Sequence, residues 1–163
     1  FIASNTDRSR YYVGELNGKS SKQAYMDALH ISESNIINQT FHNPLGKMNG
    51  QDICIISLKE VSGNGLCCYR QVNDSDVLVL LEEQDYNEIL DETLQRIRRD
   101  FNHISGVFSI NCVFRYLLFS QEHHMEDYLK TMSTLGEHAG LIGFGEHYNQ
   151  QFVNQTMTCV VFE

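Results

Sequence analysis

The chain has 163 residues, enough for one domain with a substantial core. Its hydrophobic content of 42% and charged content of 20% are typical of a globular protein. The net charge of −9 argues against nucleic acid or an anionic membrane surface as the main partner, because both require a basic face.

The start of the chain is polar, and Phe1 stands where a complete protein would begin with methionine. We therefore expect residues 1–9 to be a linker remnant or the cut end of a longer chain, and residues 10–163 to form a single domain. No apolar run approaches the roughly 18 residues of a membrane span, and no signal-peptide pattern is present. We expect a cytoplasmic protein without direct membrane insertion.

The first third of the chain predicts one strand and two helices. Arg10 to Leu16 reads as a short strand that ends in the turn pair Asn17-Gly18. Ser20, followed by Gln23, is the capping box of a helix that runs to about His30. A second short helix is expected from residue 32 toward 41, followed by a loop from 42 to 50 that contains the only proline.

The middle of the chain changes to a strand-like pattern. Asp52 to Val61, Gly65 to Val72 and Val77 to Glu83 are separated by short connections rich in glycine, asparagine and aspartate. Such connections predict an antiparallel meander.

The last part of the chain mixes helices with strands. Asp85, with Glu88, caps a long amphipathic helix that reaches about Phe101. Beyond it we predict a strand, a helix and two further strands, over residues 106–119, 121–135, 139–146 and 152–162. The fold class is therefore α+β, with a mixed, mainly antiparallel sheet and helices packed on it.

The polar and charged residues that could bind a ligand lie in the last three of these predicted strands. Arg115 interrupts an apolar run, and a buried charge needs a partner or a ligand. Its guanidinium could hold the carboxylate of a ligand or form an ion pair with Glu146 or Glu126. Strand alternation places Asn111 on the same face as Arg115, so a shared site for these two is expected.

Four other residues extend this candidate site. Glu146 follows a Gly-x-Gly step and could accept a ligand ammonium group or only satisfy neighbouring amides. Asn154 and Thr156 could offer hydrogen bonds to a ligand or cap a neighbouring strand. Cys112 reads as a small buried residue more than as a nucleophile, despite nearby histidines.

The sequence motifs do not indicate a cofactor or a metal site. The five cysteines have no CxxC spacing and are expected to be free thiols, and no HExxH pattern occurs. Gly143-x-Gly145 is not a dinucleotide fingerprint, because Tyr148 occupies the third glycine position. We expect neither a cofactor nor a metal.

The order of these motifs resembles the C-terminal half of the FIST family, the sensory domains of intracellular signal-transduction proteins. The family has a Cys-x-x-Arg strand, a Gly-Glu pair at a strand end and an Asn-x-Thr near its terminus. The residues that take these places here are Cys112, Arg115, Gly145, Glu146, Asn154 and Thr156.

The resemblance implies a ligand-sensing module for amino acids or similar small polar metabolites. It also implies partners in the full protein, namely the FIST N-terminal half or a signalling output domain such as a chemoreceptor. We expect a non-enzymatic sensor whose ligand lies near Asn111, Cys112, Arg115, Gly145, Glu146, Asn154 and Thr156. Two alternatives stay open: a small enzyme that uses Cys112 or Glu146, and a structural half that supports an absent N-terminal domain.

Overall fold

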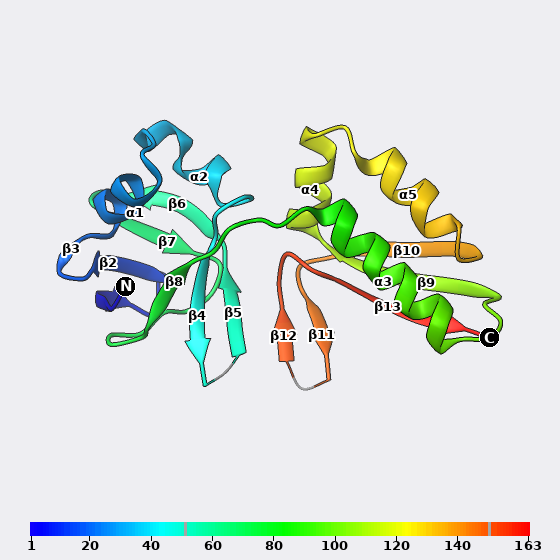
Figure 1. Ribbon diagram of the computed structural model, residues 1–163. Coiled ribbons are helices and arrows are strands. Elements are labelled where there is room, and N and C mark those ends of the chain that lie inside the picture. The colour runs from blue at the N-terminus through cyan, green and yellow to red at the C-terminus, as the bar shows by residue number, and fades with distance from the viewer. Residues whose placement is uncertain (51, 150) are drawn as a thin grey trace. The chain divides into compact units, whose positions relative to one another are not determined.

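The computed structural model describes residues 1–50, 52–149 and 151–163. The chain divides into two compact units, Phe1–Glu83 and Gln84–Glu163 (Figure 1). The sequence had suggested one continuous domain from residue 10 onward. In the structure, the main cluster of buried apolar residues lies wholly within the first unit, and the second unit buries a set of its own.

The first unit consists of two antiparallel sheets with short helices. Its elements are β1 (Ala3–Asp7), β2 (Tyr12–Leu16), β3 (Lys19–Ser20), α1 (Ser21–Leu29), the 3-10 helix η1 (Glu33–Asn35), α2 (Ile36–Gln39), β4 (Leu45–Asn49), β5 (Asp52–Ile56), β6 (Leu58–Ser62), β7 (Gly65–Cys68) and β8 (Leu78–Leu80). One sheet has the order β1-β2-β7-β6, with β3 paired to β2, and the other has the order β5-β4-β8.

The segment 1–9, expected to be a linker remnant, contains a strand that belongs to the first sheet. Strand β1 pairs with β2, and Ala3 lies opposite Leu16 in this pairing. The amino group of Phe1 donates to the carbonyl of Leu78 at 2.7 Å, and the amide of Thr6 donates to a side-chain oxygen of Asp74 at 3.0 Å. Both the backbone and the side chains of the segment tie it to its neighbours, since the Thr6 hydroxyl also donates to Asp74 at 2.9 Å.

The predicted meander is also corrected. The expected strand from Asp52 to Val61 is interrupted at Ser57, and its two parts, β5 and β6, belong to different sheets. The expected loop after residue 42 contains β4, the central strand of the second sheet. Gly46 weakens the strand-like pattern of this segment, so the sequence did not predict β4. The missing side chain of Gly46 lets Ile53 pack close, because a β-carbon there would lie 2.7 Å from an Ile53 methyl group.

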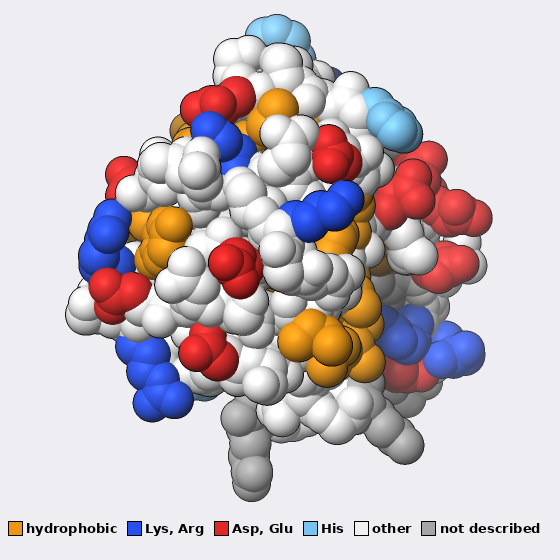
Figure 2. Space-filling model, turned by 90° about the vertical axis from the view of Figure 1, so that its left-hand side faces the viewer, with side chains coloured by type: hydrophobic (Ala, Val, Ile, Leu, Met, Phe, Trp, Pro, Cys, Tyr) orange, Lys and Arg blue, Asp and Glu red, His pale blue; other side chains and the backbone are white. Residues whose placement is uncertain are grey.

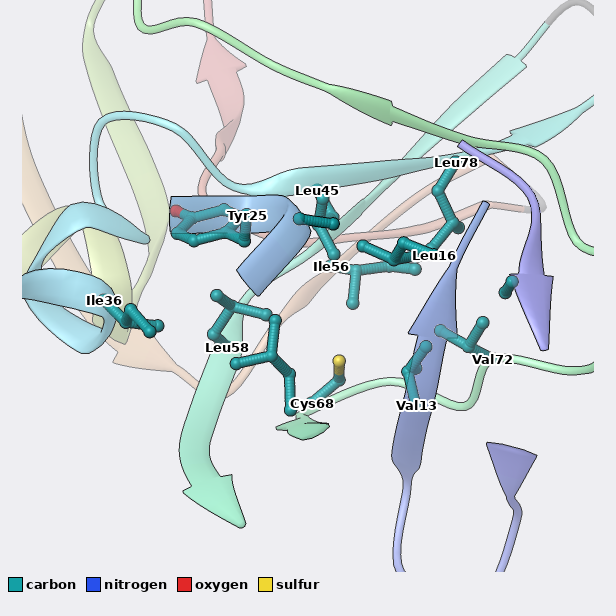
Figure 3. Packing of buried hydrophobic residues seen from close by; sticks show 13 residues of the cluster. Val13, Leu16, Tyr25, Ile36, Leu45, Ile56, Leu58, Cys68, Val72 and Leu78 are labelled. Carbon is teal, nitrogen blue, oxygen red and sulfur yellow. The ribbon is translucent and has the colours of Figure 1, made fainter. Parts of the chain in front are cut away.

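The core of the first unit lies between its sheets and α1. Tyr25 of α1 belongs to one buried cluster with Leu45 of β4, Ile56 of β5, Leu16 of β2 and Leu78 of β8 (Figure 3). The Tyr25 hydroxyl donates a hydrogen bond to the carbonyl of Asn43 at 2.7 Å. Truncation of one such buried leucine to alanine typically costs about 2–5 kcal/mol.

The second unit has a three-stranded sheet, a small hairpin and three helices in its described part. Its elements are α3 (Tyr86–Asp100), β9 (Gly106–Cys112), α4 (Val113–Gln121), α5 (Met125–Ser133), β10 (Glu137–Gly143), β11 (Glu146–Tyr148), β12 (Gln151–Val153) and β13 (Met157–Phe162). The sheet has the order β10-β9-β13, and β11 pairs with β12. Helices α4 and α5 pack against β9 and β10 (Figure 1).

The strand directions confirm the predicted α+β class. Strands β9 and β10 are parallel, and every other strand pair within the described residues is antiparallel. A parallel pair needs a long crossover, which α4 and α5 supply. Helix α3 begins where its capping box predicted, because the side chain of Asp85 accepts from the amides of Asn87 and Glu88.

The surface agrees with the acidic composition. On the face drawn in Figure 2, Lys and Arg side chains are interspersed with Asp and Glu side chains, so this face carries no continuous basic patch. Among the described residues, no helix combines the length and the apolar character that a crossing of the membrane requires.

Candidate functional site

Three strand termini of the second unit meet at one end of its sheet, which is called the edge below. In the parallel pair, Gly143 at the end of β10 lies opposite Cys112 at the end of β9. In the antiparallel pair, Met157 at the start of β13 lies opposite Asn111. The amide of Cys112 donates to the carbonyl of Thr156 at 3.1 Å, which holds the start of β13 against the end of β9. Residues just after β10 and just before β13 are therefore brought to the end of β9.

Arg115 reaches this edge from a helix, not from a strand as the sequence had suggested. The strand ends at Cys112, which is the N-cap of α4, and Arg115 lies in the first turn of that helix. Its Nε donates to Oδ1 of Asn111 at 3.1 Å. The predicted pairing of these two residues is thus present, although it arises from the strand-to-helix turn rather than from strand alternation. An apolar run such as Val113–Phe119 does not distinguish the two structures by its pattern alone.

The guanidinium of Arg115 lies against two aromatic rings. Its central carbon is 4.7 Å from the ring centroid of Phe119 and 5.7 Å from that of Tyr128. Burial lowers the pKa of Arg115, while Tyr128 and Glu146 act in the opposite direction. Arginine starts from so high a pKa that the group stays charged at neutral pH, and the ring faces favour a cation at this position.

Glu146 is the buried acid of the same edge. It begins β11, and the residue is only 2% exposed. Its Oε2 accepts a hydrogen bond from the Thr156 hydroxyl at 2.7 Å, whereas its Oε1 is buried and has no hydrogen-bond partner among the described residues. Burial raises the pKa of Glu146, while the Thr156 hydroxyl, the charge of Arg115 and the Glu146 amide pull that pKa down.

Arg115 and Glu146 influence each other through space without direct contact. Each charge favours the ionised form of the other. Yet the ion pairs found among the described residues do not include one between these two side chains. The alternative partner, Glu126, pairs with Lys130 at 2.9 Å on the exposed face of α5. A half-buried cation and a buried acid therefore lie at the same edge of the sheet, and the acid has an unused carboxylate oxygen.

Gly145 and Asn154 lie beside Glu146. Gly145 has φ of +130°, a conformation that favours glycine. A β-carbon at Gly145 would overlap the ring of Phe152 and would lie 2.9 Å from Oδ1 of Asn154. The absence of a side chain thus lets Phe152 of β12 and the following Asn154 pack close to Gly145, the residue just before Glu146.

A cavity of about 410 Å³ opens between the sheet and helices α4 and α5. Its apolar wall includes Phe119 and Met125, and its polar wall is built by Ser109, Asn111, Tyr128 and His138. Asn111 belongs both to this wall and to the hydrogen bond with Arg115, so the cavity adjoins the charged edge.

The polar side chains of the cavity form one connected network. Nδ2 of Asn111 donates to the Tyr128 hydroxyl at 2.8 Å, and that hydroxyl lies 3.4 Å from the Ser109 hydroxyl. Ser109 in turn lies 2.9 Å from Nε2 of His138. Burial lowers the pKa of His138, which favours a neutral ring that accepts the Ser109 hydrogen. The network then runs in one direction from Arg115 to His138.

All seven predicted site residues lie at or next to this edge, but they differ in what they contribute. Arg115, Asn111, Glu146 and Thr156 present polar side chains, whereas Cys112 contributes its backbone amide. The Cys112 side chain is buried, and strand alternation directs it to the face opposite Asn111.

Sequence reasoning missed Ser109, Tyr128 and His138. Tyr128 lies within the helix expected over residues 121–135; the structure buries this residue, and its hydroxyl joins the network. Ser109 stands two residues before Asn111, so strand alternation would have placed it on the same face. His138 is brought to Ser109 by the parallel pairing of β9 with β10, which the sequence does not specify.

The cysteines are free thiols, as predicted. Burial raises the pKa of Cys68 to about 12 and also raises that of Cys159. Cys112, the one weighed as a nucleophile, is 1% exposed. A catalytic cysteine needs an accessible, acidified thiol, so this geometry does not favour the cysteine-dependent alternative.

Comparison with known families gives one match. The model of the FIST C domain matches residues 22–149, which include elements of both units. Arg115 and Glu146 lie inside the matched range, and Asn154 and Thr156 lie beyond it. Neither the curated proteins nor the solved structures contain a match to the chain.

Proposed function

Because the chain belongs to the FIST C domain family, a family of sensory domains associated with signal transduction, we propose that it binds a free amino acid. The ligand lies between Arg115 and Glu146 at the edge where β9 and β10 end. Arg115 holds the α-carboxylate, and Glu146 holds the α-ammonium group.

The observation that carries this proposal is the unused oxygen of Glu146. A buried carboxylate oxygen without a hydrogen bond is costly, by about 1–3 kcal/mol or more, and calls for a donor. The Arg115 guanidinium shares the edge but is not directly paired with Glu146. A zwitterion supplies an ammonium donor to the acid and a carboxylate acceptor to the cation, so it complements both groups at once.

The remaining predicted residues complete the site. Asn111 fixes the Arg115 side chain through its Nε, and Thr156 fixes the Glu146 carboxylate through Oε2. Asn154 lies against Gly145, the residue just before the acid, and offers an amide to the ligand. Each charged group is therefore held by a second residue, which reduces the ordering that binding requires.

The signal passes through the elements that the ligand connects. Arg115 belongs to α4, and Glu146 belongs to the β11–β12 hairpin, so binding joins two separate segments of the unit. A signalling output domain or a FIST N-terminal half in the full protein responds to this change if it binds with different affinity to the ligand-bound and the ligand-free arrangement of α4 and the hairpin. No catalytic step is required, and the protein acts as a sensor in the cytoplasm.

The test is a thermal-shift screen of the purified chain against the twenty common amino acids. At least one should raise the melting temperature in a saturable way, because a ligand that binds only the folded state stabilises it. The Arg115→Gln variant should lose that response, whereas Arg96→Gln, at an exposed arginine of α3, should keep it. A response that survives Arg115→Gln would contradict the proposed role of Arg115, and a screen without any response would contradict the function.

A further inference from the structure

We propose that the cavity between the sheet and helices α4 and α5 receives the side chain of the bound amino acid, and that the ligand is therefore one with a large, uncharged, mainly apolar side chain. This inference rests on the proposed function and narrows its ligand class. It is also distinct from the sequence-based expectation of a small polar metabolite.

The position of the cavity is the first argument. The Arg115 guanidinium lies over the rings of Phe119 and Tyr128, and both of these residues line the cavity. Asn111 lines it as well and accepts the hydrogen bond from Arg115. A carboxylate held by Arg115 would thus stand at the edge of the cavity, and the side chain on the neighbouring carbon would point into it.

The size of the cavity is the second argument. Its volume of about 410 Å³ falls within the range of small-molecule sites, which begins at about 300 Å³. The side chain of glycine or alanine would leave most of this space unfilled, and unfilled apolar space forfeits dispersion contacts. A leucine, methionine or phenylalanine side chain would contact both the helix wall and the sheet wall.

The chemistry of the wall is the third argument. Met125 and Leu129 of α5 and Phe119 of α4 supply an apolar surface. Within the described residues that line the cavity, none is an aspartate, glutamate, lysine or arginine. A charged ligand side chain would lose its hydration there without gaining an opposite charge, which excludes acidic and basic amino acids.

The polar side chains of the cavity wall already form hydrogen bonds with one another. Asn111, Tyr128, Ser109 and His138 bond to one another in sequence. The network therefore stays satisfied beside an apolar guest and does not demand a polar group from it. Gly140 contributes to this wall by its missing side chain, because a β-carbon there would lie 2.6 Å from the Ser109 hydroxyl oxygen.

The decisive experiment is calorimetric titration of the wild-type chain with L-phenylalanine, L-leucine, L-alanine, glycine, L-lysine and L-glutamate. We expect phenylalanine or leucine to bind at least about tenfold more tightly than alanine or glycine, because burial of a large apolar side chain is worth that factor or more. Lysine and glutamate should bind more weakly than the best of these by a similar or larger factor.

The outcomes separate the two proposals. If glycine or alanine binds as tightly as phenylalanine and leucine, or if lysine or glutamate binds best, the cavity inference is overturned while amino-acid binding stands. If none of the six probes binds, the proposed function fails and the inference fails with it.

A pair of variants tests whether the cavity binds the side chain of the ligand. Met125→Trp adds bulk at a half-buried position of the cavity wall, whereas Leu117→Trp adds the same bulk at an exposed position of α4 that does not line it. Met125→Trp should weaken phenylalanine and leucine binding at least tenfold and leave alanine binding within about twofold. The inference is contradicted if Met125→Trp binds phenylalanine and leucine like Leu117→Trp. Should Met125→Trp fail to fold, the wild-type selectivity alone decides the matter.

Discussion

The hydroxyl of Thr156 donates to Oε2 of Glu146 at 2.7 Å, and the two residues are separated by ten positions in the sequence, with β11 and β12 in this interval. This bond joins the residue before β13 to the first residue of β11. It leaves Oε1 of the same carboxylate buried and without a partner among the described residues. The acid is thus oriented by one oxygen and left with a free acceptor at the other.

Replacement of Thr156 should therefore destabilise the second unit. Thr156→Val keeps the shape of the side chain but removes the only donor to Oε2 found among the described residues, so the cost should be about 1–3 kcal/mol. Urea denaturation at neutral pH measures this difference. The matched change Thr158→Val, within β13, should stay within about 0.5 kcal/mol. Equal effects of the two variants would show that the Thr156 bond contributes no special stability.

The acid should also give the protein a characteristic pH dependence. Burial raises the pKa of Glu146 above its ordinary value of 4.5, so the folded protein binds this proton more tightly than the unfolded chain does. The stability that this group contributes is present below pH 4.5 and is lost as the pH rises through the folded pKa.

The Glu146→Gln variant exposes this effect. Relative to wild type, the variant should become more stable as the pH is raised from 4 toward 7, because only the wild type must ionise a buried carboxyl. Melting temperatures across this range, with the exposed-site variant Glu92→Gln as control, measure the trend. A wild-type advantage that grows with pH would reverse the predicted sign.

Several features of the fold could be read from the sequence because they depend on local chemistry. The side chain of Ser20 accepts from the amide of Gln23, as a capping box requires. Asn17 and Gly18 have φ of +54° and +72°, as their turn requires. In each case neighbouring residues determine the geometry, so no knowledge of the distant chain is needed.

Other features depend on pairing between distant segments. Val113–Gln121 is as apolar as a buried strand, and it becomes a helix because the parallel pairing of β9 with β10 needs a crossover. The polar segment of β1 becomes a strand only because β2 and residues 74–78 accept its backbone bonds. The polar residues that the sequence singled out do lie together in the structure, but the cavity beside them was not predicted, because it forms only once α5 and β10 are in place.

Gly145 should tolerate substitution poorly. Gly145→Ala forces a residue with a side chain into φ of +130° and against the Phe152 ring, so it should cost about 1–3 kcal/mol and weaken ligand binding by displacing Glu146. Gly18→Ala is the control, because Gly18 has φ of +72° with open space around it. Thermal unfolding should show the larger loss for Gly145→Ala. If Gly18→Ala is the more harmful of the two, crowding at Gly145 is not the important factor.

The thiols should be slow to react in the folded protein. Cys112 is buried and therefore shielded from the reagent, and burial raises the pKa of Cys68 to about 12, so the Cys68 thiol stays protonated at neutral pH. Iodoacetamide labelling followed by peptide mass spectrometry should find little modification of either residue until urea is added. Rapid labelling of Cys112 in the native protein would instead support the enzymatic alternative.

The central claim is that Glu146 receives the ammonium group of the ligand, and the titration of its carboxyl group tests this most directly. Carbon-detected NMR of labelled glutamate, with the Glu146 signal assigned by its loss in Glu146→Gln, gives the pKa with and without a saturating amino acid. The account predicts a pKa above the ordinary range in the free protein, which falls on binding because a cation then faces the acid. A Glu146 pKa that does not change while the amino acid is bound would contradict it.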